Sequence, residues 1–215
     1  RVSTKYEIAA VTEKLDGSKA ALFENVNRSK FRLVSNLVGS RDRFAQAIGS
    51  KKSDINQKIV RAISSAKKPK ISTTAKFFEN SSNDISILPI VTHFQNESGP
   101  FITSSILYAR NQEKKSQNSS IHRLMPIGKN HFSIRMVEGR DLQRTFMFAK
   151  NRGEDLPIAI TIGVHPAITI ACAFQAKWGK NELEIANSLL NNKLTLTKCP
   201  ITGLLVPSTA EIVME

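Results

Sequence analysis

The sequence has no uninterrupted apolar run long enough to cross a bilayer. Its most apolar stretch, residues 157–174, contains Gly163, His165 and Pro166, so we interpret it as a strand followed by a helix. The N-terminal residues form no hydrophobic leader, so nothing in the sequence indicates secretion. We therefore expect a cytoplasmic protein without a membrane span.

Cysteine is scarce, and histidine shows no metal-binding pattern. The two cysteines, Cys172 and Cys199, lack the spacing of a disulfide framework, and the four histidines lack zinc spacing. We expect two reduced thiols and no zinc site.

Acidic residues are few relative to basic ones: 18 Asp and Glu stand against 31 Lys and Arg, a formal charge of +13. Residues 1–80 hold 17 basic and 7 acidic residues, so most of the excess lies there. The basic residues are scattered, and few aromatic side chains lie between them to stack on bases. Nucleic-acid binding is therefore the weaker interpretation, and surface solubility the stronger one.

Apolar periodicity predicts three helices and two strands in the first third of the chain. The helices are expected over residues 6–15, 41–48 and 55–63, and the strands over residues 20–23 and 31–34. Ser40 is placed to cap the second helix, and Gly49 to end it. Residues 67–86, rich in Lys, Ser, Asn and Thr, are typical of a linker, and we place a domain boundary near residue 85.

The rest of the chain shows more extended patterns, in apolar and β-branched runs separated by turn residues. Strands are expected over residues 87–94, 101–109, 120–127, 131–137, 158–162, 194–197 and 212–214. Helices are expected near Leu142, after Pro166 and after Asn181, which precedes Glu184 by three residues as in a capping box. The pattern alone indicates an α+β fold of 215 residues, enough for one large or two small domains.

Three segments carry amide, arginine and acidic side chains that are candidates for one shared site. They are Gln117–Arg123, Arg135–Asp141 and Asn181–Glu184. Amide and carboxylate oxygens suit a hard divalent cation, and arginine suits phosphate or carboxylate. The combination is typical of a site in which a metal ion holds a phosphorylated cofactor.

These segments resemble the UbiD family of decarboxylases, which use prenylated flavin mononucleotide (prenylated FMN). Other short motifs are similar to the family in order and spacing: residues 22–26, 34–41, 92–94, 99–103, 157–163, 165–167, 198–199 and 206–213. The resemblance covers nearly the whole chain. It implies a mixed α/β N-terminal domain over residues 1–85 and a split β-barrel flavin-binding domain with flanking helices over residues 86–215.

The resemblance also implies a metal site beside the flavin phosphate. Asn118 and Glu182 match the family's manganese ligands, and potassium is an alternative ion. Asp141 occupies a position that is often histidine in the family, and its carboxylate oxygens suit the same hard ion. Asn118 and Glu182 also have ordinary structural interpretations: Asn118 as a turn cap, and Glu182 as a favourable charge at a helix N-terminus.

Cofactor and substrate contacts are implied for a further set of residues. The cofactor-contacting positions are Ile121, His122, Arg123, Arg135, Met136, Val137 and Arg140. Arg123 also matches the arginine that holds the substrate carboxylate, which makes it the catalytic candidate. On a strand Ile121 and Arg123 share one face and His122 takes the other. The alternative to these roles is that Arg123 and Arg135 are ordinary exposed residues of the hairpin.

The implied activity is reversible, non-oxidative decarboxylation of an aromatic or α,β-unsaturated carboxylic acid. Family chains continue beyond the segment matching residues 210–213 to an acidic pair that supplies the proton, so we assign no general acid here. The chain is then a fragment, a subunit of a split enzyme with a partner chain, or a binding protein without turnover. Homo-oligomers are usual in the family.

Overall fold

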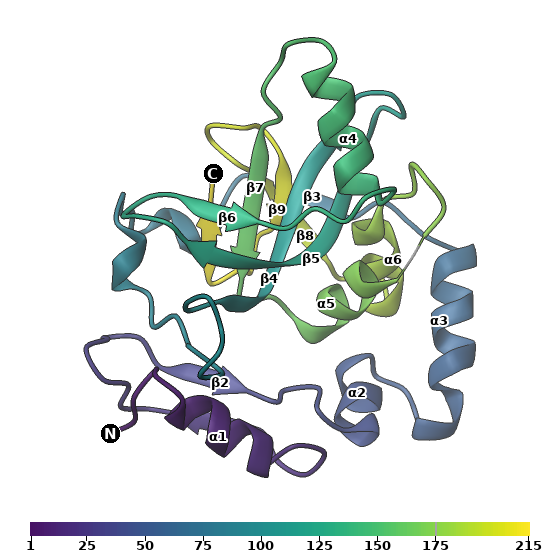
Figure 1. Cartoon of the computed structure of the whole chain (residues 1–215). Coiled ribbons are helices and arrows are strands. Elements are labelled where there is room, and N and C mark those ends of the chain that lie inside the picture. The colour runs from purple at the N-terminus through teal and green to yellow at the C-terminus, as the bar shows by residue number, and fades with distance from the viewer. Residues whose placement is uncertain (175) are drawn as a thin grey trace.

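A five-stranded antiparallel sheet forms the centre of the computed structural model, which describes residues 1–174 and 176–215. Its strand order is β10-β7-β4-β5-β6 (Figure 1). The strands are β4 (Ile102–Asn111), β5 (Ser116–Pro126), β6 (Phe132–Ile134), β7 (Ile158–Ile162) and β10 (Ile212–Met214). The expected hairpin around residues 128–130 is confirmed, since β5 pairs with β6.

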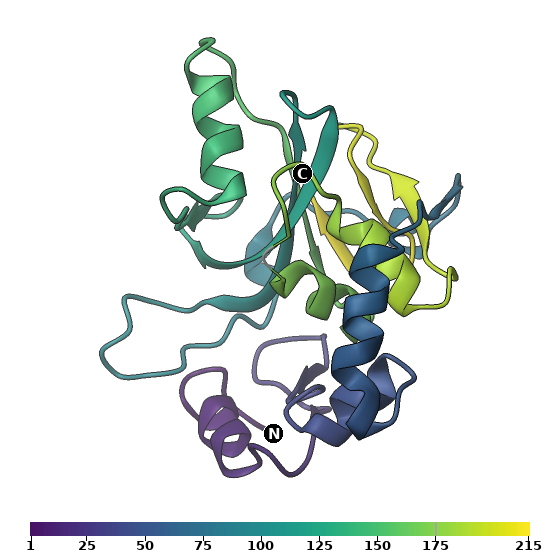
Figure 2. The ribbon, with the colours of Figure 1, turned by 90° about the vertical axis from the view of Figure 1, so that its right-hand side faces the viewer.

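Alternating side chains of β4 place one apolar layer on each face of this sheet. Ile106 and Tyr108 pack in one cluster with residues of α5 (Pro166–Ala173) and α6 (Glu182–Leu189). Leu107 and Ala109 pack on the other face with Leu142 of α4 (Asp141–Lys150). Figure 2 shows α4 on the opposite side of the sheet from α5 and α6. The predicted helices at these three places are confirmed.

A second, three-stranded sheet has the order β3-β8-β9. Its strands are β3 (Lys70–Ser72), β8 (Thr195–Lys198) and β9 (Leu205–Pro207). β3 pairs in parallel with β8, so the expected linker contributes a strand to this sheet. The Gln117 side chain joins the sheets: its amide nitrogen donates to the Leu205 carbonyl at 2.6 Å, and the Leu205 N–H donates to its amide oxygen at 2.9 Å.

These elements confirm the α+β class. The strand pairings of the described residues form separate open sheets, and their closure into a split β-barrel stays a prediction. So does the domain boundary near residue 85. No helix within residues 1–174 and 176–215 is long and apolar enough to span a membrane.

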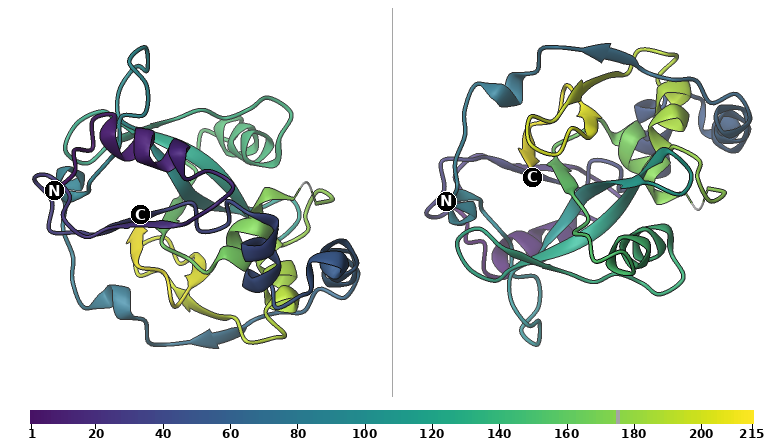
Figure 3. Two further views of the ribbon diagram at one scale, coloured as in Figure 1. Left: turned by 90° about the horizontal axis from the view of Figure 1, so that it is seen from below. Right: turned by 90° about the horizontal axis from the view of Figure 1, so that it is seen from above.

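α1 (Glu7–Lys14), β1 (Ala21–Phe23), β2 (Leu33–Ser35) and α2 (Arg41–Ala47) lie below the central sheet in Figure 1 and nearest the viewer in the view from below in Figure 3. α3 (Ile55–Ser64) lies at the side of the molecule. The short 3₁₀ helices are η1 (Lys52–Asp54), η2 (Lys76–Phe78) and η3 (Ile85–Ile87). The predicted cap is confirmed, because the Arg43 N–H donates to the Ser40 hydroxyl at 3.3 Å. Gly49 follows α2 with φ +61°, a left-handed conformation suited to glycine.

The expected strand over residues 87–94 is wrong. This segment makes only isolated bridges, Val91 with Phe101 and Thr92 with Lys5. Pro89 lacks an N–H and interrupts any continuous ladder there. Val91 is nevertheless buried, in a small core with Ile8 and Val26.

Candidate functional site

The candidate residues gather along one edge of β5. β4 pairs with β5 along most of its length, whereas β6 pairs only with residues 124–126 in the described part of the chain. The backbone of the preceding residues is therefore available at this edge. There the Ser119 N–H donates to the Glu182 carboxylate at 2.8 Å, which joins β5 to the start of α6.

Glu182 is the first residue of α6, where a carboxylate favours the positive end of the helix dipole. The expected cap is confirmed: the Asn181 side chain accepts the Leu183 N–H at 2.9 Å. Glu182 is only 3% exposed. Burial is the main cause that raises the pKa of its carboxyl to about 7, and the nearby Asp141 charge acts in the same direction. Hydrogen bonds from its own N–H, from Ser119 and from the Asn118 side chain act in the opposite direction.

Asn118 and Asp141 therefore both lie close enough to act on Glu182. Asn118 is buried on β5, and Asp141, at the first position of α4, is half-buried. Burial raises the pKa of the Asp141 carboxyl, while the charges of Arg144 and Arg140 lower it. We call these three residues the carboxylate edge.

The carboxylate edge lacks a compensating cation at close range. Within residues 1–174 and 176–215, neither carboxylate lies within 4.0 Å of a Lys or Arg nitrogen. The adjacent Ser119 hydroxyl is buried and has no hydrogen-bond partner among the described residues. Two carboxylates and the Asn118 amide oxygen form a donor set that suits a hard divalent cation, whereas the Ser119 side chain alternates with Asn118 and lies on the other face of β5. No cluster of three or more His, Cys, Asp or Glu side chains suited to a metal occurs in the described part of the chain.

A short hydrogen-bond chain runs along the same face of β5. The Ser120 hydroxyl lies 3.3 Å from the Asn118 amide oxygen and 2.9 Å from His122 Nε2. The His122 ring also bonds to the Arg135 backbone, which raises its pKa, but burial is the larger effect and lowers it overall. His122 therefore ties the strand to the segment after β6.

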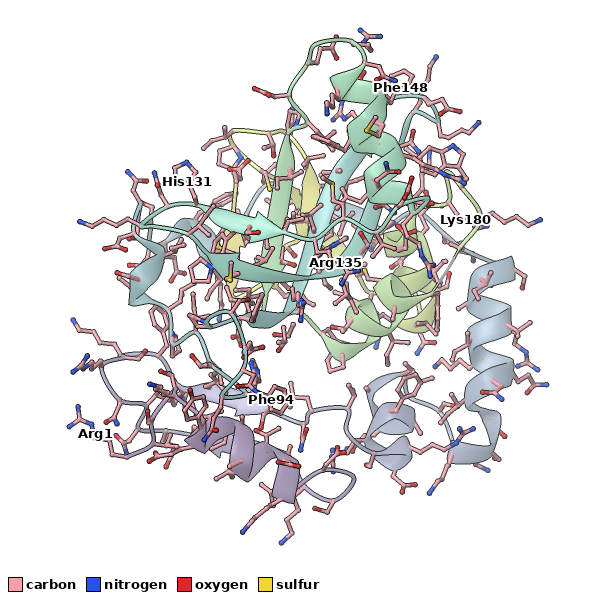
Figure 4. All side chains as sticks on the ribbon, in the orientation of Figure 1. Arg1, Phe94, His131, Arg135, Phe148 and Lys180 are labelled. Carbon is pink, nitrogen blue, oxygen red and sulfur yellow. The ribbon has the colours of Figure 1, made fainter. Side chains whose placement is uncertain are left out.

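The other predicted residues form an exposed rim around this edge. Figure 4 shows Arg135 in front of the central sheet. Met136 is half-buried against the core on the α4 side. The exposed residues are Ile121, Arg123, Arg135, Val137 and Arg140. The Arg123 guanidinium carbon lies 4.8 Å from the centre of the Phe101 ring. The expected alternation is confirmed by burial, since half-buried His122 lies between exposed Ile121 and Arg123.

Sequence reasoning assigned no role to Ser119, Ser120 or Phe101. Their place in the sequence could have pointed to them, because the two serines lie within the segment that carries Asn118 and Phe101 lies in one of the family-like motifs. Two other clefts, of about 320 and 510 Å³, lie against α3 and contain none of the carboxylate edge.

The fold and the site define an α+β protein in which a buried carboxylate, Glu182, lies near a half-buried one, Asp141, at the edge of the central sheet. The chain belongs to the UbiD family. Residues 64–215 match the 3-octaprenyl-4-hydroxybenzoate carboxy-lyase Rift-related domain, and residues 1–63 match the N-terminal domain of the same carboxy-lyases.

Curated relatives include anhydromevalonate phosphate decarboxylases. That of Methanothermobacter thermautotrophicus is 31% identical over 214 residues, covering 100% of this chain and 50% of the relative. That of Methanosarcina mazei is 33% identical over 216 residues, covering 100% of this chain and 49% of the relative. The chain therefore spans about half the length of the curated relatives it matches.

Solved structures agree with the fold. The UbiD-class enzyme HmfF from Pelotomaculum thermopropionicum, in an evolved dimeric form in complex with prFMN, superposes with a TM-score of 0.93 at 35% identity, covering 99% of this chain and 51% of that one. Vanillic acid decarboxylase from Sedimentibacter hydroxybenzoicus has a TM-score of 0.92 at 22% identity, covering 99% and 49%. The latter supports the fold alone.

Proposed function

We propose that this chain is the part of a UbiD-type carboxy-lyase that holds prenylated FMN and a divalent cation. The activity is reversible, non-oxidative decarboxylation of an aromatic or α,β-unsaturated carboxylic acid. The carboxylate edge is the observation that carries the proposal, because a buried Glu182 beside a second carboxylate needs a cation to remain ionised. The structural likeness to HmfF, whose complexes contain prFMN and FMN, supports the identity of the cofactor.

The cation would be held by Asn118, Asp141 and Glu182. All three offer oxygen ligands, as Mn²⁺ prefers, and K⁺ is the alternative. A cation here would lower the pKa of Glu182 and neutralise part of a phosphate bound beside it. Metal binding and flavin binding should therefore depend on each other.

The exposed rim would receive the flavin. Ile121, Met136 and Val137 offer apolar contacts, while Arg135 and Arg140 offer charge for the phosphate. His122, on the face of β5 that carries Asn118, would contribute to the cofactor site through its bonds to Ser120 and Arg135. The bound cofactor supplies the reactive dipole that adds to the unsaturated acid and allows carbon dioxide to leave.

Arg123 would bind and orient the substrate carboxylate. Its guanidinium is exposed at the rim and can form two parallel hydrogen bonds to a carboxylate. We place the general acid outside these 215 residues, in the other half of a longer chain or in a partner chain, and we expect a homo-oligomer. The split β-barrel and the domain division at residue 85 belong to the same proposal.

Native mass spectrometry tests this proposal on protein produced together with a flavin prenyltransferase and manganese. We expect one prenylated FMN and one divalent ion per chain, both lost together in Glu182→Ala. In the complete enzyme, Arg123→Ala should abolish decarboxylation while the cofactor remains bound, and Arg152→Ala, a control on the outer surface of the α4 region, should remain active. Full activity of Arg123→Ala, or metal retained by Glu182→Ala, would refute the assigned roles.

A non-catalytic, cofactor-binding subunit is the second candidate, favoured by the half-length match to the relatives. Cofactor and metal bound without decarboxylation, even with the remaining half of the enzyme present, would support it.

A further inference from the structure

We propose that Phe101 is a positioning residue for Arg123, and that the N-terminal segment of the chain holds Phe101 in place. This inference rests on the proposed role of Arg123 in binding the substrate carboxylate. It adds a residue that touches neither the substrate nor the cofactor in that proposal.

The Arg123 guanidinium lies over the Phe101 ring. The Arg123 guanidinium carbon lies 4.8 Å from the centre of the half-buried Phe101 ring, within the range of a cation–π interaction. Arg123 itself is exposed, and a long exposed side chain loses considerable rotamer freedom when it is fixed. The ring limits that freedom before substrate arrives, so less entropy is lost on binding.

The chemistry of the contact matters as much as its distance. No carboxylate among the described residues forms an ion pair with Arg123. A carboxylate partner would occupy the guanidinium N–H donors and neutralise its charge. An aromatic ring attracts the cation through its π-system and leaves the N–H donors available for a planar, two-point contact with a substrate carboxylate.

Phe101 is held in turn by backbone hydrogen bonds. Its N–H donates to the Val91 carbonyl at 2.9 Å, and Val91 is 7% exposed in the small N-terminal core. The neighbouring Thr92 is bonded on both sides of its peptide: its N–H donates to the Thr4 carbonyl at 3.0 Å, and its carbonyl accepts the Tyr6 N–H at 3.0 Å. Backbone hydrogen bonds therefore link residues 4–6 through residues 91–92 to Phe101, whose ring lies under Arg123.

A matched pair at the C-terminal end of α4 provides the control: Phe148 lies on the helix and Arg152 in the turn that follows it. The Arg152 guanidinium carbon lies 5.8 Å from the Phe148 ring, and Arg152 also forms an ion pair with Glu154 at 2.8 Å. That arginine has a carboxylate to fix it, so its ring should matter little. Phe148→Leu thus removes an aromatic ring beside an arginine without touching the proposed site.

The test compares Phe101→Leu, Phe101→Tyr and Phe148→Leu in the complete, cofactor-loaded enzyme. Activity is measured with an aromatic or α,β-unsaturated acid that the wild type decarboxylates, from a panel including benzoate and cinnamate. Phe101→Leu should lower kcat/KM about tenfold, mainly through KM because the loss affects carboxylate binding. Phe101→Tyr, which keeps the ring, should restore most of it, and Phe148→Leu should match the wild type.

NMR of the Arg123 Nε–H group gives a readout that does not depend on turnover. The Phe101 ring current should shift this resonance upfield in the wild type and in Phe101→Tyr, and the shift should vanish in Phe101→Leu. Equal kcat/KM for Phe101→Leu and wild type, or an unshifted Arg123 resonance in the wild type, would overturn the inference. If the wild type decarboxylates no acid, the proposed function fails while the ring-current comparison still decides whether Phe101 holds Arg123.

Discussion

Glu182→Gln should remove one pH-dependent contribution to stability. The folded-state pKa of Glu182 is raised from 4.5 to about 7, so the folded protein binds this proton more tightly than the unfolded chain does. The associated stability is fully present below pH 4.5 and is lost as the pH rises through about 7. At about 1.4 kcal/mol per pKa unit, the loss is on the order of 3 kcal/mol.

Urea unfolding at pH 5 and pH 8, with EDTA present, measures this loss. Wild-type protein should lose about 3 kcal/mol more stability over the interval than Glu182→Gln, whose side chain stays neutral. At pH 8 without metal, the variant should therefore be the more stable protein. Glu184→Gln, a second carboxylate in the first turn of α6, is the matched control for the helix dipole.

With manganese at pH 8, the wild type should instead be more stable than Glu182→Gln. Because the ion binds the ionised carboxylate, Mn²⁺ should stabilise the wild type strongly at pH 8 and weakly at pH 5. It should have little effect on Glu182→Gln at either pH. Parallel stability curves for wild type and Glu182→Gln, or equal stabilisation of both by Mn²⁺, would refute the reasoning.

Three further substitutions test the framework around the site. Gly163 has φ +71°, and an added Cβ would lie 2.5 Å from a Glu211 carboxylate oxygen. Gly163→Ala should therefore lower the thermal midpoint more than Gly153→Ala, where φ is +70° and the space around the added Cβ is open. Equal losses in the two variants would show that only the backbone angle matters. Gln117→Leu removes both bonds to the Leu205 backbone and should cost about 1–3 kcal/mol in urea unfolding, and an unchanged midpoint would contradict that bridge. Asn187→Leu leaves the Leu194 N–H and the Lys67 and Lys68 carbonyls without this partner, and it should speed amide exchange at Leu194; unchanged exchange would argue against the link.

Local chemistry explains why much of the fold was predictable. Ser40 and Asn181 cap their helices as the sequence indicates, and the apolar runs around β4 and β7 form buried strands. The strand expected at residues 87–94 failed because an apolar run does not reveal whether a neighbouring strand will pair with it. The place of β3 in the second sheet depends on pairing with distant β8, which no local pattern encodes.

The site likewise combines features that the sequence indicates with features that depend on long-range contacts. The sequence indicates which residue types suit a cation and a phosphate, and the resemblance indicates their roles. Neither the sequence nor the resemblance indicates that the Ser119 N–H donates to Glu182 or that Phe101 lies beneath Arg123. Both contacts join residues that are separated in the chain by at least one strand or helix. The raised pKa of Glu182 likewise depends on burial created only in the folded chain.

The parallel pairing of β3 with β8 also sets an order of events during synthesis. β4 and β5 are adjacent in the chain, so their hairpin can close as soon as both have left the ribosome. Residues 70–72 must wait until residues 195–198 emerge, because their strand partner does not exist earlier. During that interval the strand carrying Ile71 is unpaired, and we expect this segment to be prone to pairing with other nascent chains until β8 has formed.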